Sequence, residues 1–383
     1  MRVVIVGAGV SGLFIAYELA REGIDRIVVL ERSYVGAGST GRCATGIRAS
    51  FTSEEHVVLM RESIRLWEEH SRGELGDYGL TFVRGGYLWV ARREETLDYF
   101  RKLVSLHNRL GVPTRVIGAD EAKELVPQLR TDIIAGAMHD PTAGKSYVFT
   151  TLRALMKACS ERGVEIRTRS AVTKLAAEGG VVKAAVLESG ERIKGDVFVI
   201  AAGSGSRELL KTLGIELPTK NMPRHIMVTE AFARAFDPLV VDWDTPGAPY
   251  TVQSTEGNFF IARELEEEPE LSIYSQRIDF IPKALKPIAE LLPFLRAVRV
   301  LRYWIGYYVT TPDNHPVYGP VKSYSNLFLA TGFSGHGYMM GPVTGKVIAS
   351  WVLRGKPCIE HAARLTLERF EKGALIKELA VVG

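Results

Sequence analysis

Three glycines near the N-terminus, followed by an acidic residue, have the spacing of a dinucleotide-binding loop. Gly7, Gly9 and Gly12 form the pattern GxGxxG. In that pattern the first glycine permits a tight turn, the second lets the backbone approach a pyrophosphate, and the third lets the next helix lie close on the strand. Glu31 stands 19 residues after Gly12, where a carboxylate accepts hydrogen bonds from both hydroxyls of an adenosine ribose. The spacing therefore predicts a nucleotide site.

A strand–helix–strand unit has to position these residues. Residues 2–6 and 27–30 are short apolar runs, typical of buried parallel strands, and residues 10–22 have the apolar spacing of a helix. The segment 32–42 is rich in glycine and hydroxyl residues, so it can bring further backbone N–H groups to the pyrophosphate and then pass along a flavin ring. A single NAD-binding unit has no need of such a loop. The segment favours FAD over NAD, with an ordinary connecting loop as the weaker alternative.

The composition excludes several classes of protein. The 383 residues carry a net charge of +4, which is too small for a nucleic-acid footprint. Three cysteines without CxxC spacing or a matched histidine cluster predict neither a disulfide framework nor a metal site, and they fit a reducing compartment. We expect no transmembrane segment and a cytoplasmic chain that is mature from Met1. Only three glutamines and five asparagines occur, a bias seen in some thermophile proteins.

Five segments carry a resemblance to a known family. They are residues 7–12 with Glu31, 36–42, 197–203, 311–313 and 330–337, and together they resemble the FAD-dependent amine and amino-acid oxidoreductases typified by D-amino-acid oxidase, glycine oxidase and sarcosine oxidase. Residues 38–40, 45–48 and 332–340 look most like the catalytic β subunit of archaeal dye-linked L-proline dehydrogenase. The β subunit of heterotetrameric sarcosine oxidase is also similar.

The resemblance implies an α/β fold with a doubly wound, Rossmann-like FAD-binding domain and a second α+β substrate domain built on an antiparallel sheet. We expect the FAD-binding domain in residues 1–50, 145–215 and 312–383, and the substrate domain in residues 51–144 and 216–311. Within the substrate domain the apolar pattern predicts strands at 84–90, 226–229 and 258–261 and helices at 54–70 and 96–110. The acidic run 264–268 reads as a solvated turn, with a subunit contact as the alternative.

The resemblance also implies which residues contact the cofactor. The turn 332–337 would aim backbone N–H groups at the flavin edge that becomes negative on reduction. Gly306 stands where monomeric sarcosine oxidases have the cysteine that attaches FAD covalently, so we expect noncovalent FAD, and the resemblance allows an FMN at a subunit interface. The expected cofactor-binding residues are Gly7, Gly9, Gly12, Glu31, Arg32, Gly38, Ser39, Thr40, Arg42, Val172, Ala202, Gly203, Gly332, Gly335, His336 and Gly337.

Four residues are expected to act on the substrate. Arg48 falls where sarcosine oxidases have the arginine that binds the substrate carboxylate, a task suited to a guanidinium fork, and Arg42 is the competing candidate. Tyr308 matches their active-site tyrosine, and Tyr250 would complete an aromatic wall. Alternation along a strand predicts that only one of Tyr307 and Tyr308 faces the pocket, and we choose Tyr308.

His336 is the fourth, near the flavin or the substrate carboxylate, with a structural role in its loop as the alternative. His225 is expected to support the substrate-domain strand rather than react. Core packing is the alternative for the tyrosines of segment 303–308.

Two departures from the family pattern bear on the reaction. Met339 replaces a second carboxylate-binding lysine of the sarcosine oxidases, and residues 221–282 contain no lysine, although those enzymes draw their oxygen-activating lysine from this region. We therefore predict a dehydrogenase that oxidises the C–N bond of a secondary amino acid, L-proline first and sarcosine second, by hydride transfer to flavin N5. Its electrons would go to a partner flavoprotein subunit, although a homo-oligomer stays open. The alternatives are a 2-hydroxy-acid or glycerol-3-phosphate dehydrogenase, and a noncatalytic flavin-holding subunit.

Overall fold

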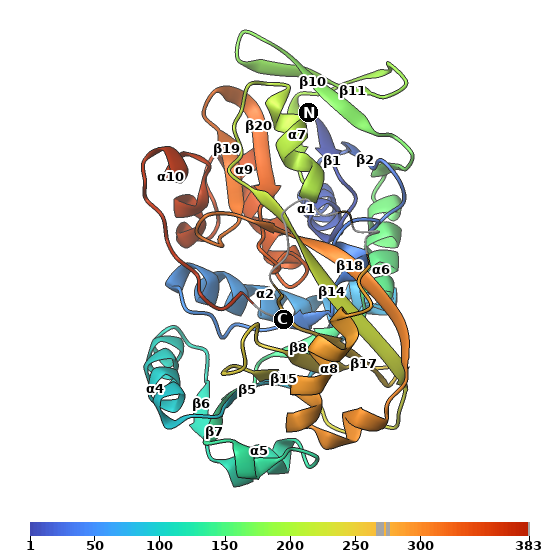
Figure 1. Ribbon diagram of the computed structural model, residues 1–383. Helices are drawn as coiled ribbons and strands as arrows, with labels where there is room; N and C mark the ends of the chain where they lie inside the picture. Colours follow the sequence, from blue (N-terminus) through green and yellow to red (C-terminus); the bar gives the residue numbers. More distant parts are fainter. Residues whose placement is uncertain (266–271, 273–275, 382–383) are drawn as a thin grey trace.

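A computed structural model describes residues 1–265, 272 and 276–381 of the chain, and two large sheets organise it (Figure 1). The first sheet has six strands in the order β19-β20-β13-β1-β2-β9, and all neighbours are parallel except β19 and β20. Its strands are β1 (Arg2–Val6), β2 (Arg26–Leu30), β9 (Glu165–Arg167), β13 (Val197–Ile200), β19 (Val317–Val321) and β20 (Tyr324–Thr331).

Both faces of this parallel sheet are buried, which explains the unbroken apolar runs in its strands. Val3 and Ile5 belong to the core under the helices α1 (Val10–Arg21), α6 (Val148–Glu161) and α9 (Gly341–Arg354). Val4 and Val6 belong to a second core on the other face. That core lies under α7 (Ser206–Lys211) and a three-stranded sheet of β10 (Val172–Glu178), β11 (Val181–Leu187) and β12 (Arg192–Lys194).

The second large sheet has eight strands in the order β18-β14-β17-β16-β15-β5-β7-β6, antiparallel except for the pair β5 and β15. The predicted α/β class with a parallel sheet and a second, antiparallel sheet is confirmed. The strands are β5 (Tyr87–Ala91), β6 (Arg115–Ile117), β7 (Gly136–Asp140), β14 (Lys220–Ala231), β15 (Leu239–Asp242), β16 (Tyr250–Gln253), β17 (Asn258–Ala262) and β18 (Val300–Thr310).

Helices cover both faces of the antiparallel sheet. Residues of α8 (Phe280–Leu291) and α5 (Ala119–Leu125) pack in one core, and residues of α4 (Glu94–Arg109) pack in the core on the other face. The long α2 (Glu54–Arg72) lies between the two large sheets and packs on α9 (Figure 1). The ranges predicted for the two domains stay a prediction.

The predicted strand 84–90 is wrong as a single element. It is two strands, β4 (Phe82–Arg84) and β5, because Gly85 and Gly86 break it and Gly86 has a φ of +86°. β4 pairs with β8 (Gly144–Ser146), which also pairs with β3 (Gly46–Ile47). Of the acidic run 264–268, residues 266–268 lie outside the described residues, while Glu264 forms an ion pair with Arg224.

The remaining helices are short: α3 (Glu74–Asp77), α10 (Glu368–Glu371), and the 3-10 turns η1 (Thr40–Arg42), η2 (Thr131–Ile133), η3 (Gly203–Gly205), η4 (Pro293–Ala297) and η5 (Glu360–Leu365). The chain after α10 returns to the region between the two large sheets (Figure 1). Among the described helices, none is both long enough and apolar enough to cross a membrane.

Candidate functional site

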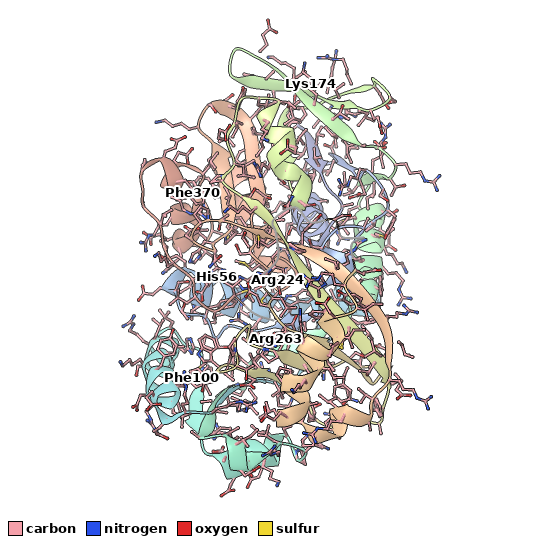
Figure 2. All side chains as sticks on the ribbon, viewed as in Figure 1. His56, Phe100, Lys174, Arg224, Arg263 and Phe370 are labelled. Atoms are coloured by element: carbon pink, nitrogen blue, oxygen red, sulfur yellow. The ribbon has the colours of Figure 1, made fainter. Side chains whose placement is uncertain are left out.

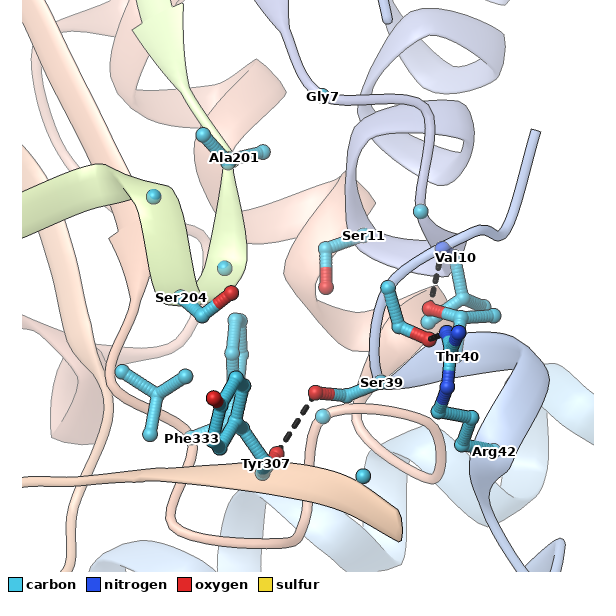
Figure 3. A pocket seen from close by; sticks show the side chains of 18 of the residues that line it. Gly7, Val10, Ser11, Ser39, Thr40, Arg42, Ala201, Ser204, Tyr307 and Phe333 are labelled. Atoms are coloured by element: carbon cyan, nitrogen blue, oxygen red, sulfur yellow. Dashed lines mark hydrogen bonds between the residues drawn. The ribbon is translucent and has the colours of Figure 1, made fainter. Parts of the chain in front are cut away.

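One cavity of about 570 Å³ lies where the two large sheets meet (Figure 3). Its walls include the carboxyl ends of β1, β2 and β13, the loop after β2, and the strands β14, β16 and β18. Ligands of open α/β sheets bind in crevices outside the carboxyl ends of the strands. The topology of the first sheet therefore places this cavity where a nucleotide is expected.

The glycine-rich turn after β1 has no room for side chains. A Cβ added to Gly7, whose φ is +107°, would lie 2.3 Å from the carbonyl oxygen of Ala201. A Cβ on Gly12 would lie 2.0 Å from the carbonyl oxygen of Gly7, so Gly12 permits close packing and does not itself line the cavity. The backbone N–H of Val10, in the first turn of α1, donates to Thr40 Oγ1 at 3.2 Å. The positive end of α1 thus faces the cavity wall, as anion binding requires.

Glu31 directly follows β2, with its carboxylate at the cavity. It is 8% exposed, Oε2 accepts the N–H of Ala8 at 3.0 Å, and Oε1 accepts the N–H of Ser33 at 2.9 Å. These two bonds hold the carboxylate beside the glycine-rich turn. Each oxygen can accept a further bond, so the arrangement fits the two hydroxyls of a ribose.

The loop after Glu31 is fixed by its own hydrogen bonds. Ser39 Oγ donates to the carbonyl of Tyr307 at 2.7 Å, which ties the loop to β18 (Figure 3). Arg42 lines the cavity, but its guanidinium donates to the carbonyls of Ala37 and Gly38, the latter at 2.9 Å. Arg42 therefore holds this loop, and these bonds do not suit it to bind a substrate carboxylate.

The opposite wall is built from small residues and backbone. Gly335 has a φ of +97°, and a Cβ there would lie 2.5 Å from the ring of Tyr308, so the backbone passes directly over that tyrosine. Nearly all of the expected cofactor residues line the cavity: Gly7, Gly9, Glu31, Arg32, Gly38, Ser39, Thr40, Arg42, Val172, Ala202, Gly203, Gly332, Gly335 and Gly337. These walls could hold FAD, and the placement of the adenosine at Glu31 and of the flavin at the turn 332–337 stays a prediction.

An aromatic wall from the antiparallel sheet closes the far end of the cavity. Tyr250 and Tyr308 line it and are hydrogen-bonded to each other. Burial raises the pKa of both phenols, so both are neutral at physiological pH. The Arg224 guanidinium lies 5.2 Å from the centre of the Tyr308 ring and also pairs with Glu264. Arg224 lies at the middle of the molecule (Figure 2).

The structure brings both neighbouring tyrosines to the cavity, whereas alternation predicts that only one of them faces it. Tyr307 and Tyr308 both line the cavity, and the Tyr307 side chain points into it (Figure 3). Alternation fails here because β18 crosses the cavity, packing on both η1 and η3. The two faces of β18 therefore border different parts of the same cavity, and a tyrosine on either face can line it.

Arg48 and His336 do not line this cavity, contrary to expectation. Arg48 is fully buried, stacks 3.7 Å from the centre of the Phe51 ring, and donates to the carbonyls of Ser50 and Ala380, each at 2.7 Å. The segment around Ala380, from the C-terminal part of the chain, covers the guanidinium. The His336 ring packs against Phe51 and a second buried histidine, His56.

Sequence reasoning missed several residues of the wall, among them Arg224, Cys43, Phe333 and Tyr338. Phe333 and Tyr338 flank the glycines of the turn 332–337, so their position beside a predicted motif was the available signal. Arg224 lies just before the predicted strand 226–229, which in the structure is part of the longer β14. His225 is hydrogen-bonded to Tyr303 and stacks on Phe280, which agrees with a supporting role.

Comparison with known proteins agrees with this geometry. Residues 2–351 match the family model described as FAD dependent oxidoreductase. The chain is 27% identical to sarcosine oxidase subunit beta of Rhodobacter capsulatus, over 100% of this chain and 91% of that protein, and 29% identical to sarcosine oxidase subunit beta of an Arthrobacter species, over 98% and 92%. The crystal structure of L-proline dehydrogenase from P. horikoshii superposes with a TM-score of 0.93 at 30% identity, covering 98% of each chain.

Proposed function

Because the chain belongs to the family of FAD-dependent oxidoreductases, we propose that it is a dehydrogenase that oxidises the C–N bond of a secondary amino acid, L-proline first and sarcosine second. One observation carries the proposal. A single cavity joins Glu31 and the glycine-rich turn to Tyr250, Tyr308 and Arg224 at the antiparallel sheet. The likeness to L-proline dehydrogenase and to sarcosine oxidase subunits supports this choice of substrate. Bound FAD would supply the acceptor for the hydride that leaves the carbon next to the nitrogen.

Arg48 is the proposed ligand of the substrate carboxylate. One of its terminal N–H groups donates to the carbonyl of Ala380, and a carboxylate forms stronger, charge-assisted bonds with a guanidinium than a neutral carbonyl does. A substrate that displaces Ala380 would therefore gain this contact. Arg224, which lines the cavity itself, is the competing ligand.

The charges around the tyrosines favour a neutral amine. Arg224 and Arg48 both act electrostatically on Tyr308, and Glu264, the ion-pair partner of Arg224, acts with the opposite sign. A substrate ammonium beside that ring therefore meets two guanidiniums whose effect Glu264 offsets in part. Nearby positive charge lowers the pKa of an amine. The site would thereby release the proton of the substrate nitrogen, which makes its lone pair available when the hydride leaves.

The tyrosine pair would position the substrate rather than transfer protons. Burial keeps both phenols neutral, and the hydrogen bond between them fixes the direction of the hydroxyl that donates, that of Tyr250. Two large rings at the end of the cavity exclude water and present a flat wall, which suits a five-membered ring or a small N-methyl group.

FAD is proposed to bind without a covalent bond. A covalent bond to FAD would need a nucleophile such as a thiol, and the residues that line the cavity include one cysteine, Cys43. Its thiol donates to the carbonyl of Thr40 at 3.0 Å, and burial raises its pKa to about 12. It is therefore protonated at neutral pH and a poor nucleophile.

Electrons are proposed to pass to a partner flavoprotein subunit, with FMN at the interface, rather than mainly to O₂. Among the residues that the structure describes, those that line the cavity include no lysine, and residues 221–282 of the sequence contain none. The match to subunits named sarcosine oxidase subunit beta supports a multi-subunit enzyme.

A dye-linked assay tests the proposal. The purified protein should reduce an artificial dye with L-proline, more slowly with sarcosine, and should produce little hydrogen peroxide in air. Arg48→Lys should raise the KM for L-proline by about 10-fold or more, since lysine cannot form the bidentate pair, and Arg224→Lys is the matched comparison. Dye reduction by 2-hydroxyglutarate or glycerol 3-phosphate alone would favour a hydroxy-acid or glycerol-phosphate enzyme. Inactivity with every substrate would favour a flavin-holding subunit.

A further inference from the structure

Three buried residues from distant parts of the chain meet beside the turn 332–337. His56 belongs to α2, His315 follows β18, and Glu378 belongs to the segment after α10. His56 and His315 are fully buried, and so is Glu378. One potential ligand atom from each lies within 4.8 Å of the other two. His56 lies near the middle of the molecule (Figure 2).

Within the part of the chain that the structure describes, three of the four ring nitrogens of His56 and His315 lack a hydrogen-bond partner, while the fourth, Nδ1 of His56, lies 3.5 Å from Ser53 Oγ and 3.7 Å from Glu378 Oε2. The three are both ring nitrogens of His315 and Nε2 of His56. The two ring centres are 4.2 Å apart, and the ring of His336 lies 5.0 Å from that of His56. Buried polar atoms are nearly always paired, so these nitrogens indicate a ligand that is not part of the polypeptide.

Charges of both signs lie at the cluster. The guanidiniums of Arg48 and Arg369 act electrostatically on His56, and the carboxylate of Asp313 acts with the opposite sign. The neighbouring Asp313 is bridged by Arg369 at 2.8 and 2.9 Å. That pairing neutralises Asp313 and leaves Glu378 as the carboxylate of the cluster.

Hydrogen bonds orient the carboxylate of Glu378. Oε1 accepts the N–H and the hydroxyl of Thr52 at 3.0 and 2.6 Å and the N–H of Ala380 at 2.9 Å. Oε2 accepts the N–H and the hydroxyl of Ser53 at 3.0 and 2.7 Å. Metal-binding carboxylates are typically held by an outer layer of bonds, and a metal here would replace one of the bonds from a hydroxyl group. Without a metal, the role of Glu378 is to bind Thr52 and Ser53, the two residues before α2.

From this geometry we infer that His56, His315 and Glu378 bind one divalent transition-metal ion of the Zn²⁺ type, which clamps the C-terminal segment to α2 and to the loop after β18. Two imidazoles and a carboxylate are a known Zn²⁺ ligand set, with bonds of about 2.0–2.2 Å and a fourth position for water. Ligand atoms of a tetrahedral site are about 3.4 Å apart, so the side chains close in by about 1 Å.

The clamp bears on the substrate site because Ala380 is two residues beyond Glu378. The carbonyl of Ala380 accepts the N–H of Arg48, so a metal on Glu378 holds the segment that covers this guanidinium. The metal site itself does not depend on which substrate the enzyme oxidises, and its test needs no turnover.

Metal content and thermal stability test the inference on the full-length protein without a histidine tag. Expression with added Zn²⁺ should give about one zinc per chain by elemental analysis. After removal by chelator, Zn²⁺ at about 100-fold its Kd should raise the Tm by several degrees, whereas Mg²⁺ should not. Carboxypeptidase should trim the C-terminal segment at least several-fold faster from the metal-free protein.

Conservative variants distinguish a metal site from a hydrogen-bonded cluster. His315→Asn and Glu378→Gln should each reduce bound zinc at least 10-fold. Glu378→Gln keeps the shape of the side chain, so it still tests the site if His315→Asn impairs folding. His70→Asn is the control, because His70 is also buried and its Nε2 lies 4.0 Å from a carboxylate oxygen of Glu18. This variant should bind as much zinc as the wild type. A wild-type protein with no zinc and no Tm response to Zn²⁺, Co²⁺ or Ni²⁺ would overturn the inference and leave Glu378 as the hydrogen-bond partner of Thr52 and Ser53 alone.

Discussion

Replacing Glu31 with glutamine should weaken FAD binding without closing the cavity. The two side chains have the same shape, but glutamine has one oxygen where glutamate has two. In the protein each carboxylate oxygen accepts a backbone N–H, from Ala8 and from Ser33. One of these donors would face the amide NH₂ group, and the negative charge at the nucleotide would be lost.

The expected size of the effect comes from the bonds to the ribose. A hydrogen bond to a charged group contributes about 1.5–3 kcal/mol and a neutral one about 0.5–1.5 kcal/mol. The loss is therefore about 1 kcal/mol for each of two ribose hydroxyls. The weakened hydrogen bonds to the N–H groups of Ala8 and Ser33 affect the protein both with and without FAD. Their loss therefore largely cancels in the free energy of FAD binding. A total of about 2 kcal/mol corresponds to roughly a 30-fold higher Kd.

Titration of the deflavinated protein with FAD, followed by quenching of flavin fluorescence, measures this Kd. Glu208→Gln is the matched control, because Glu208 also lines the cavity but its side chain is 69% exposed and pairs with Lys211. Its Kd should change less than about 3-fold. An unchanged Kd in Glu31→Gln would refute the placement of the adenosine ribose at Glu31.

Three further predictions concern the cofactor and stability. Gly7→Ala should abolish FAD binding and lower the yield of folded protein, measured by flavin content, because the new Cβ meets the Ala201 carbonyl at a φ of +107°. Acid precipitation should leave the yellow colour in the supernatant, because we propose that FAD is bound without a covalent bond, and a yellow pellet would contradict this. Burial lowers the pKa of His107 below its ordinary value, so its contribution to stability is present above about pH 6.5 and is lost as the pH falls. His107→Gln should therefore flatten the fall in Tm between about pH 7 and pH 5, and a parallel fall in both proteins would contradict the assignment.

The first sheet could be predicted because its signals are local. The strand, glycine turn, helix and second strand follow one another within about thirty residues, and each buried strand is an unbroken apolar run. The eight-stranded sheet could be predicted only as antiparallel strands. Its parallel pair joins Tyr87 to Leu239, and no local pattern encodes a pairing between residues so far apart in sequence.

The candidate site divides in the same way. Residues of the glycine-rich turns line the cavity as expected. A glycine motif determines the path of the backbone, and that path depends on local geometry. Arg48 behaves differently, since its position depends on contacts with Phe51 and with the distant Ala380. The cluster of His56, His315 and Glu378 had no sequence signal, because its members are far apart in the chain and only the packed fold brings them together.

Anaerobic titration of the purified, yellow protein with L-proline tests the central proposal most directly. The flavin absorbance should bleach with L-proline, then return slowly in air and rapidly when an artificial dye is added. Sarcosine should bleach it at higher concentration, and D-proline and 2-hydroxyglutarate serve as comparisons. A protein that stays yellow with every amine would contradict the amino-acid dehydrogenase, and bleaching by 2-hydroxyglutarate alone would replace it with a hydroxy-acid enzyme.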